Sequence, residues 1–484
     1  MGFSSPIFVF YFLPLVLLGY FLLPSNARKP YRNVFLLSVS IFFYAWGEKF
    51  FVQLLLYSLI FNHTVGNKIN DSKNPQKRWY WLLFGVIANI SLLVIFKYGY
   101  FFVENTRWFW YTFSIRPPLR EKLHLPIGIS FFTFQAISYL IDIYRRELVA
   151  QRNFISFGVY VFLFPHLIAG PIVRYKDIAG QISERPVSVS KLAEGIRRFI
   201  IGLAKKMLFA NTFGQTADMI FQYNPQELSS GAAWLGILCY TLQIYFDFSG
   251  YSDMAIGLGK MFGFDFLENF NYPYIATSIT DFWRRWHISL SSWFRDYVYI
   301  PLGGNRCSSW KTYRNLMIVF ILCGLWHGAN WTFVIWGMYH GCFLVLERLG
   351  FAKILHRLPK PLQHSYMLMV VILGWIFFRS ADLDHACQYI TQLIPGTTSL
   401  YSFADFWNQK LALTWCFGII ACVPILPWTQ EQISRWKTNH TKQKEMLLET
   451  VTSMASMIGL QLIMFLVIVR ITSETYQPFI YFQF

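Results

Sequence analysis

Charged residues are scarce in this sequence. Asp, Glu, Lys and Arg make up 14% of the 484 residues, whereas soluble globular domains average about 25%. Hydrophobic residues make up 55%. This balance argues against an ordinary soluble or disordered protein and favours a chain that crosses a membrane many times.

The motifs of common soluble enzymes are missing as well. The sequence has no Walker A loop, no H-E-x-x-H pair and no nucleophile elbow, and GLGKMFG (257–263) lacks the spacing of a dinucleotide-binding loop. Its seven cysteines form no C-x-x-C and lie mostly in apolar runs, so packing explains them better than disulfides or metal binding. Because His, Cys and carboxylates nowhere stand at ligand spacing, we predict no bound metal.

Apolar runs that could cross about 30 Å of hydrocarbon recur along the chain. They are residues 7–23, 34–46 with 50–61, 79–96, 127–143, 154–169, 199–213, 232–246, 316–333, 338–346, 367–378, 411–426 and 454–469. We expect roughly ten to thirteen helices, and some should be tilted or re-entrant because several runs fall short of the roughly 20 residues of a perpendicular span. The sequence therefore predicts an all-α polytopic membrane protein with one membrane domain over residues 1–484.

The positive charge has a simple explanation in such a protein. The formal net charge is +17, and basic clusters fall between apolar runs at residues 28–32, 68–78, 306–314 and 435–444. Cytoplasmic loops of membrane proteins are rich in Lys and Arg, so we predict no nucleic-acid partner. With all these clusters in the cytoplasm, both ends of the chain are expected on the extracytoplasmic side.

His327, in the stretch GLWHGANW, is the strongest candidate for chemistry. Ionisable groups inside hydrocarbon cost at least about 2.5 kcal/mol and are usually functional. A helix that starts near Leu316 would place His327 about 17 Å deep, with Asn330 on the same face three residues later. Desolvation favours a neutral imidazole, which can take a proton from a hydroxyl and return it to a leaving group. The alternative is a core histidine bonded to a neighbouring helix.

Gly324 and Gly328 flank this histidine and stand four residues apart. On a helix they would share one face, where the lack of side chains permits close approach by a second helix or by a ligand. We therefore expect either a neighbouring helix or a ligand to approach closely beside His327.

A second histidine stands in DFWRRWHISLSSWFRD, within a segment, 265–314, that we predict to lie at the membrane interface. On a helix, Asp281 would pair with Arg284 or Arg285. In one interpretation the stretch is an anchor helix with solvated charges and with tryptophans at the lipid head groups. In the other, the arginines attract an anionic cofactor or lipid while His287 faces the reaction.

Two further stretches are weaker candidates. His166 stands in FPHLIAGP, where prolines would break a helix, and irregular backbone at membrane depth often lines cavities. DFSGYSD (247–253) places two carboxylates near the end of an apolar run. For both, a structural role in a broken helix is the alternative.

These motifs together resemble the signature of the membrane-bound O-acyltransferase superfamily, in particular its bacterial branch that acetylates exported polysaccharides such as alginate and peptidoglycan. The resembling segments are PIGISFFTFQ (126–135), FPHLIAGPIVR (164–174), DFWRRWHISLSSWFRDYVYIPLGGNR (281–306) and LWHGANWTFVIWGMYHG (325–341). The resemblance implies tilted, re-entrant and interfacial helices around a central funnel. It also places His327 at the family's catalytic histidine and His287 at its second histidine position.

The end of the chain, PFIYFQF (478–484), is aromatic, although chain ends are usually polar. It resembles a short tyrosine-containing motif of related bacterial systems. From this resemblance we expect the tail to fold into the extracytoplasmic opening, where Tyr481 would carry an acetyl group towards a separate SGNH-hydrolase-like acetyltransferase. The alternative for Tyr481 is an aromatic-belt position at the end of a span.

The resemblance thus implies an O-acetyltransferase of the bacterial inner membrane, surrounded by lipids. Acetyl-CoA would be the cytoplasmic donor and an exported or cell-wall polysaccharide the acceptor. Two alternatives stay open: a lysophospholipid acyltransferase on the same scaffold, and a non-catalytic transporter of acyl groups or polymer with a histidine proton relay. The sequence shows no evident inverted repeat of the kind many transporters carry, which argues against the second alternative.

Overall fold

The computed structural model describes residues 2–23, 30–119, 121–396, 399–437 and 442–473. Helices make up almost all of the regular structure in these ranges, and the only β pairing described there is an isolated bridge between Leu228 and Tyr401. The fold class is therefore all-α.

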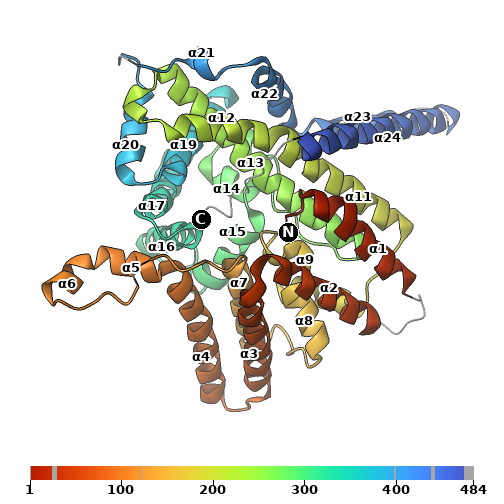
Figure 1. Cartoon of the computed structure of the whole chain (residues 1–484), viewed down its shortest axis with the longest axis vertical. Coiled ribbons are helices and arrows are strands. Elements are labelled where there is room, and N and C mark those ends of the chain that lie inside the picture. The colour runs from red at the N-terminus through yellow and green to blue at the C-terminus, as the bar shows by residue number, and fades with distance from the viewer. Residues whose placement is uncertain (1, 24–29, 120, 397–398, 438–441, 474–484) are drawn as a thin grey trace.

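The helices follow one another along the chain in the order shown in Figure 1. The α-helices are α1 (Leu13–Leu22), α2 (Pro30–Glu48), α3 (Val52–Asp71), α4 (Pro75–Leu93), α5 (Gly99–Asn105), α6 (Arg107–Thr112), α7 (Ile129–Tyr144), α8 (Phe154–Phe162), α9 (Phe164–Leu167), α10 (Tyr175–Ser183), α11 (Val189–Ala204), α12 (Asn211–Gln222), α13 (Ser230–Met261), α14 (Ile279–Arg285), α15 (Ile288–Phe294), α16 (Ser309–His327), α17 (Trp331–Leu346), α18 (Ala352–Leu355), α19 (Lys360–Arg379), α20 (Leu383–Gln392), α21 (Phe403–Phe406), α22 (Gln409–Ala421), α23 (Ile425–Lys437) and α24 (Lys442–Ser473). Short 3-10 or π segments lie at η1 (Phe8–Phe12), η2 (Lys49–Phe51), η3 (Val94–Tyr98), η4 (Lys205–Ala210), η5 (Pro225–Glu227), η6 (Pro273–Ile275), η7 (Arg295–Tyr299) and η8 (Glu347–Phe351).

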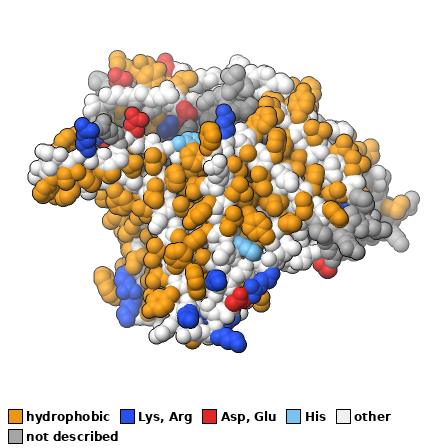
Figure 2. All heavy atoms as spheres, turned by 60° about the horizontal axis from the view of Figure 1, so that its bottom comes forward, with side chains coloured by type: hydrophobic (Ala, Val, Ile, Leu, Met, Phe, Trp, Pro, Cys, Tyr) orange, Lys and Arg blue, Asp and Glu red, His pale blue; other side chains and the backbone are white. Residues whose placement is uncertain are grey.

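Long apolar helices confirm a polytopic membrane protein. By length and composition, four stretches among the described residues can cross a bilayer: Tyr31–Asp71, Pro75–Asn105, Lys360–Arg379 and Leu448–Ser473. Shorter apolar helices, such as Ile129–Tyr144, stand beside them. Hydrophobic side chains cover much of the face in Figure 2, as expected for a surface in contact with lipid.

The longest central helix, α13, packs against α11 through pairs of glycines. A Cβ atom added at Gly195 would lie 2.6 Å from the carbonyl oxygen of Gly257, and one at Gly202 would lie 2.6 Å from that of Gly250. Glycines at these crossings let the two backbones touch, as is common between helices in membranes.

The DFSGYSD stretch lies inside α13, and its carboxylates form ion pairs across this same interface. Asp253 pairs with Arg198 at 2.6 Å and with Lys205 at 2.7 Å. Asp247 pairs with Lys206 at 2.6 Å, and both side chains are buried. These pairs support a structural role, although the helix is continuous here and not broken.

Helices α16 and α17 form an antiparallel hairpin, so the expected single span over residues 316–333 is wrong. Helix α16 ends at His327, and Gly328 is extended. Asn330 then caps α17, its side chain accepting a hydrogen bond from the Thr332 backbone N–H at 3.2 Å. Asn is among the preferred N-cap residues, which explains why a new helix begins here. Asn330 consequently does not share a helix face with His327.

Glycines bring the two arms of the hairpin into backbone contact, which confirms the close approach expected at Gly324. A Cβ atom at Gly324 would lie 2.2 Å from the carbonyl oxygen of Phe333, and one at Gly337 would lie 2.2 Å from that of Phe320. Neither position has room for a methyl group unless the arms separate.

We predict that Gly337→Ala destabilises the protein by about 1–3 kcal/mol, because an overpacked helix contact forces the backbones apart. Thermal unfolding of the purified protein in detergent measures this. The matched control is Gly459→Ala in α24, where an added Cβ would meet nothing within 4 Å. Equal melting temperatures for the two variants would contradict the packing argument.

Candidate active site

His327 is held at the tip of the hairpin by aromatic rings. The side chain is buried. Its ring lies 5.0 Å from Phe378, 5.2 Å from Trp336 and 5.0 Å from Trp326, each contact being edge-on. Packing against three large rings leaves the imidazole little freedom to change rotamer.

A cavity of about 570 Å³ reaches His327. Its wall combines the turn of the hairpin with η3, α5 and the segment that leads into α7. Residues that line it include Lys97, Lys122, His124, Ser130, His327 and Asn330. His327 therefore forms part of the cavity wall, and the volume falls within the range of about 300–1,000 Å³ that is typical of small-molecule sites.

His287 interrupts the helix expected over residues 281–296. Helix α14 ends at Arg285, and His287 has φ 45° and ψ 54°, the left-handed conformation, before α15 begins at Ile288. Non-glycine residues rarely adopt this conformation, and when they do they often mark functional sites. The side chain is 1% exposed.

Asn269 determines which nitrogen of His287 carries the proton. The Asn269 Oδ1 atom accepts hydrogen bonds from the Ser289 backbone N–H at 3.1 Å and the Ser289 hydroxyl at 2.9 Å, while Nδ2 donates to Ser252 at 3.0 Å. This identifies the amide oxygen. Since Nδ1 of His287 lies 3.1 Å from that oxygen, Nδ1 must be the protonated nitrogen of a neutral ring. The buried Nε2 is then the basic nitrogen, and it makes no hydrogen bond to the described part of the chain.

Trp326 links the two histidines. Its ring lies 6.0 Å from the ring of His287 and 5.0 Å from that of His327. The two predicted histidines, 40 positions apart in the sequence, therefore contact one tryptophan. Asn330 lines the same cavity as His327, and its Nδ2 donates a hydrogen bond to the Ala381 carbonyl at 2.7 Å.

The two arginines lie away from the cavity lining. Arg285 pairs with Asp281 at 3.0 Å, which confirms one of the expected i, i+4 contacts, and Arg284 is exposed. Trp283, Trp286 and Trp293 of the same stretch are buried. These tryptophans pack inside the protein, so the expectation that they lie at lipid head groups is wrong. Tyr481 lies outside the described residues.

Sequence reasoning overlooked Lys97 and Tyr98, which hold the end of α16. The Lys97 Nζ atom donates to the carbonyl of Trp326 at 2.6 Å and to that of His327 at 2.9 Å. The Tyr98 hydroxyl donates to the Leu325 carbonyl at 2.5 Å. The last carbonyls of a helix lack partners within it, and here two side chains supply them. A lysine directly after the apolar run 79–96 was the available signal.

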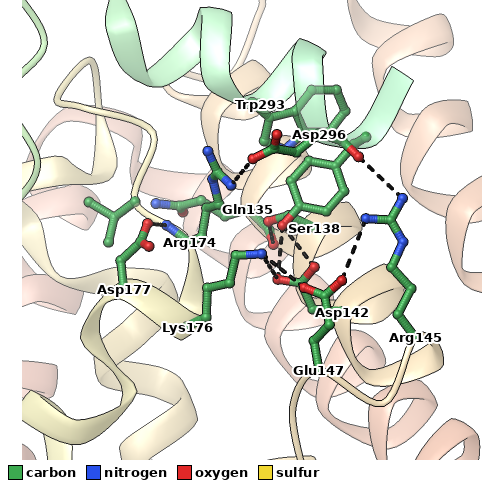
Figure 3. A network of polar contacts seen from close by, with 12 residues as sticks. Gln135, Ser138, Asp142, Arg145, Glu147, Arg174, Lys176, Asp177, Trp293 and Asp296 are labelled. Atoms are coloured by element: carbon green, nitrogen blue, oxygen red, sulfur yellow. Dashed lines mark hydrogen bonds and ion pairs between the residues drawn. The ribbon is translucent and has the colours of Figure 1, made fainter. Parts of the chain in front are cut away.

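A network of polar contacts ties the motif segments together (Figure 3). Arg174 pairs with Asp296 at 2.6 Å, and the buried Asp142 accepts hydrogen bonds from the Tyr297 hydroxyl at 2.9 and 2.8 Å. Above it, the Trp293 ring stacks on Phe134 at 3.8 Å. These contacts join α7, the start of α10 and η7, and so fix the helix that follows His287.

His166 lies in broken backbone, as its flanking prolines suggested. The short helix α9 carries Pro165 near its start. The buried His166 ring accepts a hydrogen bond at Nδ1 from the Gln135 side chain at 3.0 Å. This bond connects two of the motif segments and is consistent with a structural role.

Among the residues that the structure describes, no group of three or more His, Cys, Asp or Glu side chains could hold a metal ion. All seven cysteines are free thiols.

We predict that Asn269→Leu abolishes the tautomer preference of His287, because leucine has the same branched shape but cannot accept a hydrogen bond from Nδ1. Nitrogen-15 NMR of histidine-labelled protein distinguishes the tautomers by chemical shift. Ser252→Ala is the matched control, because it leaves Oδ1 in place. A His287 spectrum that is identical in the Asn269→Leu variant and the wild type would contradict the assignment.

Comparison with known proteins identifies the family. The family model of the membrane-bound O-acyltransferases matches residues 129–379. The chain is 40% identical to the probable alginate O-acetylase AlgI of Azotobacter vinelandii and 40% identical to that of Pseudomonas aeruginosa, each over the full length of both chains. It is also 39% identical to the peptidoglycan O-acetyltransferase of Helicobacter pylori over 81% of this chain and 79% of that protein. Matches of this extent show that the chain belongs to the membrane-bound O-acyltransferase family.

Proposed function

We propose that this membrane O-acyltransferase moves acetyl groups from cytoplasmic acetyl-CoA to an exported or cell-wall polysaccharide of the alginate or peptidoglycan type. The observation that carries the proposal is the buried His327 on the wall of a cavity large enough for a ligand. The names of the full-length relatives, alginate O-acetylases, support acetyl as the transferred group and a polysaccharide as the acceptor.

His327 acts as the general base in this mechanism. A hydroxyl group in the cavity loses its proton to the imidazole as its oxygen attacks the carbonyl carbon of the thioester. The carbonyl oxygen takes up the negative charge, the C–S bond then breaks, and the imidazole returns the proton to the CoA thiolate. The aromatic rings around His327 keep the imidazole aligned for both transfers and exclude water.

His287, which contacts the same tryptophan as His327, supports the same reaction. Its basic Nε2 is buried near the reacting histidine, with the proton of the neutral ring on Nδ1. A second neutral imidazole provides a proton acceptor without placing another charge in the site. Arg284 and Arg285 then contribute to attraction of the anionic CoA near the protein surface.

The topology supports transfer across the membrane. Basic clusters precede α4 and α16, and cytoplasmic loops are rich in such residues. Helix α16 therefore runs outward, and its tip with His327 and the cavity faces the extracytoplasmic side. In this arrangement both chain ends lie outside the bacterial inner membrane, and the donor approaches from within.

The C-terminal tail provides the hydroxyl group for this attack. Tyr481 enters the extracytoplasmic cavity, its hydroxyl attacks the thioester, and the acetyl-tyrosine then transfers acetyl to a separate SGNH-hydrolase-like acetyltransferase. A tyrosine hydroxyl, with a usual pKa of about 10, is a poor nucleophile at neutral pH unless a base removes its proton. His327 supplies that base.

We predict that His327→Ala lowers transfer of labelled acetyl from acetyl-CoA by about 10²–10⁴-fold, the usual contribution of a positioned general base. The measurement uses the purified full chain and follows labelled acetyl and released CoA. His356→Ala, which removes an exposed histidine, is the control. Acylation of a lysolipid by a protein that does not use acetyl-CoA would favour the lipid acyltransferase. Transport without any turnover of acetyl-CoA would favour the transporter.

We predict that Tyr481→Phe abolishes acetylation of the polymer in cells and removes the acetylated tail peptide from mass spectra of the purified protein, because phenylalanine has no hydroxyl. Tyr476→Phe, five residues before Tyr481, is the matched control. Full polymer acetylation by the Tyr481→Phe variant would contradict the relay and leave the role of His327 intact.

We predict opposite labelling of two surface positions in a cysteine-free background. Tyr111→Cys, at a 75% exposed position in α6, should react with a membrane-impermeant maleimide in spheroplasts, whereas Trp310→Cys, at a 77% exposed position in the basic cluster at the start of α16, should react only after lysis. The reverse pattern would invert the proposed topology.

A further inference from the structure

Lys97 and Tyr98 reach α16 from the π turn η3, which extends α4. Successive residues of a regular helix point about 100° apart and do not share one neighbour. Here both side chains bind carbonyls of the last turn of α16. Such π turns are frequent at functional sites, and this one delivers an amine to the wall of the cavity.

The amine has one more donor than the protein uses. A lysine ammonium carries three N–H donors. Two are accepted by the carbonyls of Trp326 and His327, at 2.6 and 2.9 Å. The described residues offer no third acceptor, while Lys97 and His327 line the same cavity. The remaining donor is therefore available to a ligand that lies beside the imidazole.

The charge of Lys97 is also incompletely compensated. Among the described residues, no carboxylate lies within ion-pair distance of Nζ. The carbonyl end of α16 carries a partial negative charge that favours a cation, and the Trp326 ring lies 6.0 Å from Nζ. A cation in such surroundings is stabilised further when an oxygen next to it becomes negative.

Taking these observations together, we propose that Lys97 is a catalytic residue that donates its third N–H to the acyl carbonyl oxygen as that oxygen becomes negatively charged. The inference rests on the proposed acyl transfer. When the hydroxyl oxygen bonds to the carbonyl carbon and its proton moves to His327, the carbonyl π electrons move onto the oxygen bound by Lys97. They return as the C–S bond breaks, and the thiolate takes the proton from His327.

A purely structural role makes a different prediction. If Lys97 only held the end of α16, any side chain that donates to the two carbonyls would replace it. Lys97→Gln retains two N–H donors but has neither the third donor nor the charge. Lys97→Arg retains both the charge and a surplus of donors. Tyr98→Phe removes one hydrogen bond to the same turn and leaves the amine in place.

The test measures kcat and KM for acetyl-CoA by chromatography of released CoA, with thermal unfolding of each full-length variant. We expect Lys97→Gln to lower kcat by about 10²–10³-fold, the usual effect of losing one oxyanion donor, with KM within about threefold of the wild type. Lys97→Arg should recover at least about tenfold of that loss, and Tyr98→Phe should cost at least about tenfold less than Lys97→Gln.

Three results would overturn the inference. The first is a kcat of Lys97→Gln close to that of the wild type. The second is a change in KM alone, which indicates that Lys97 binds the ground state, and the third is an equal loss of kcat in Tyr98→Phe, which indicates that Lys97 only caps the helix. If Lys97→Gln does not fold, the ratio of kcat between Lys97→Arg and Tyr98→Phe decides between a catalytic and a capping role. A wild-type protein that releases no CoA would instead overturn the proposed function and the inference with it.

Discussion

The site depends on a helix that ends inside the protein. Backbone carbonyls at membrane depth must find hydrogen-bond partners, yet α16 stops at His327 and leaves its last carbonyls without partners in the helix. Lys97 and Tyr98 provide those partners. A helix that continued past His327 would satisfy its own carbonyls, but it would lose the turn from Gly328 to Asn330 that lines the cavity.

The glycine contacts serve the same arrangement at a larger scale. Gly324 and Gly337 let the arms of the hairpin touch, and the pairs between α11 and α13 keep the central helix in place. Close backbone packing is the main route to stability between helices in lipid, where burial of apolar surface gives little. The polar network of Figure 3 adds directional bonds between the motif segments.

Much of this arrangement could be predicted from the sequence. Hydropathy predicted the fold class and the long apolar helices, and the cost of a histidine at membrane depth made His327 a candidate. The helix breaks inside the motifs were harder to predict. The run 316–333 is apolar apart from His327, Asn330 and Thr332, so the N-cap preference of Asn330 was the available signal for the turn. The left-handed backbone at His287 has no signature in a stretch that reads as helix. Asn269 and Lys97 act through contacts between distant segments, which one sequence cannot display.

The hairpin separates two tasks along the chain. Glycines pack its two arms against each other, and these arms fix the position of the hairpin within the membrane domain. Its three-residue turn, Gly328 to Asn330, contributes to the cavity wall together with the segment before α7. Evolution can therefore alter these short wall segments to accommodate a different acceptor, while the membrane architecture and the position of the imidazole stay the same.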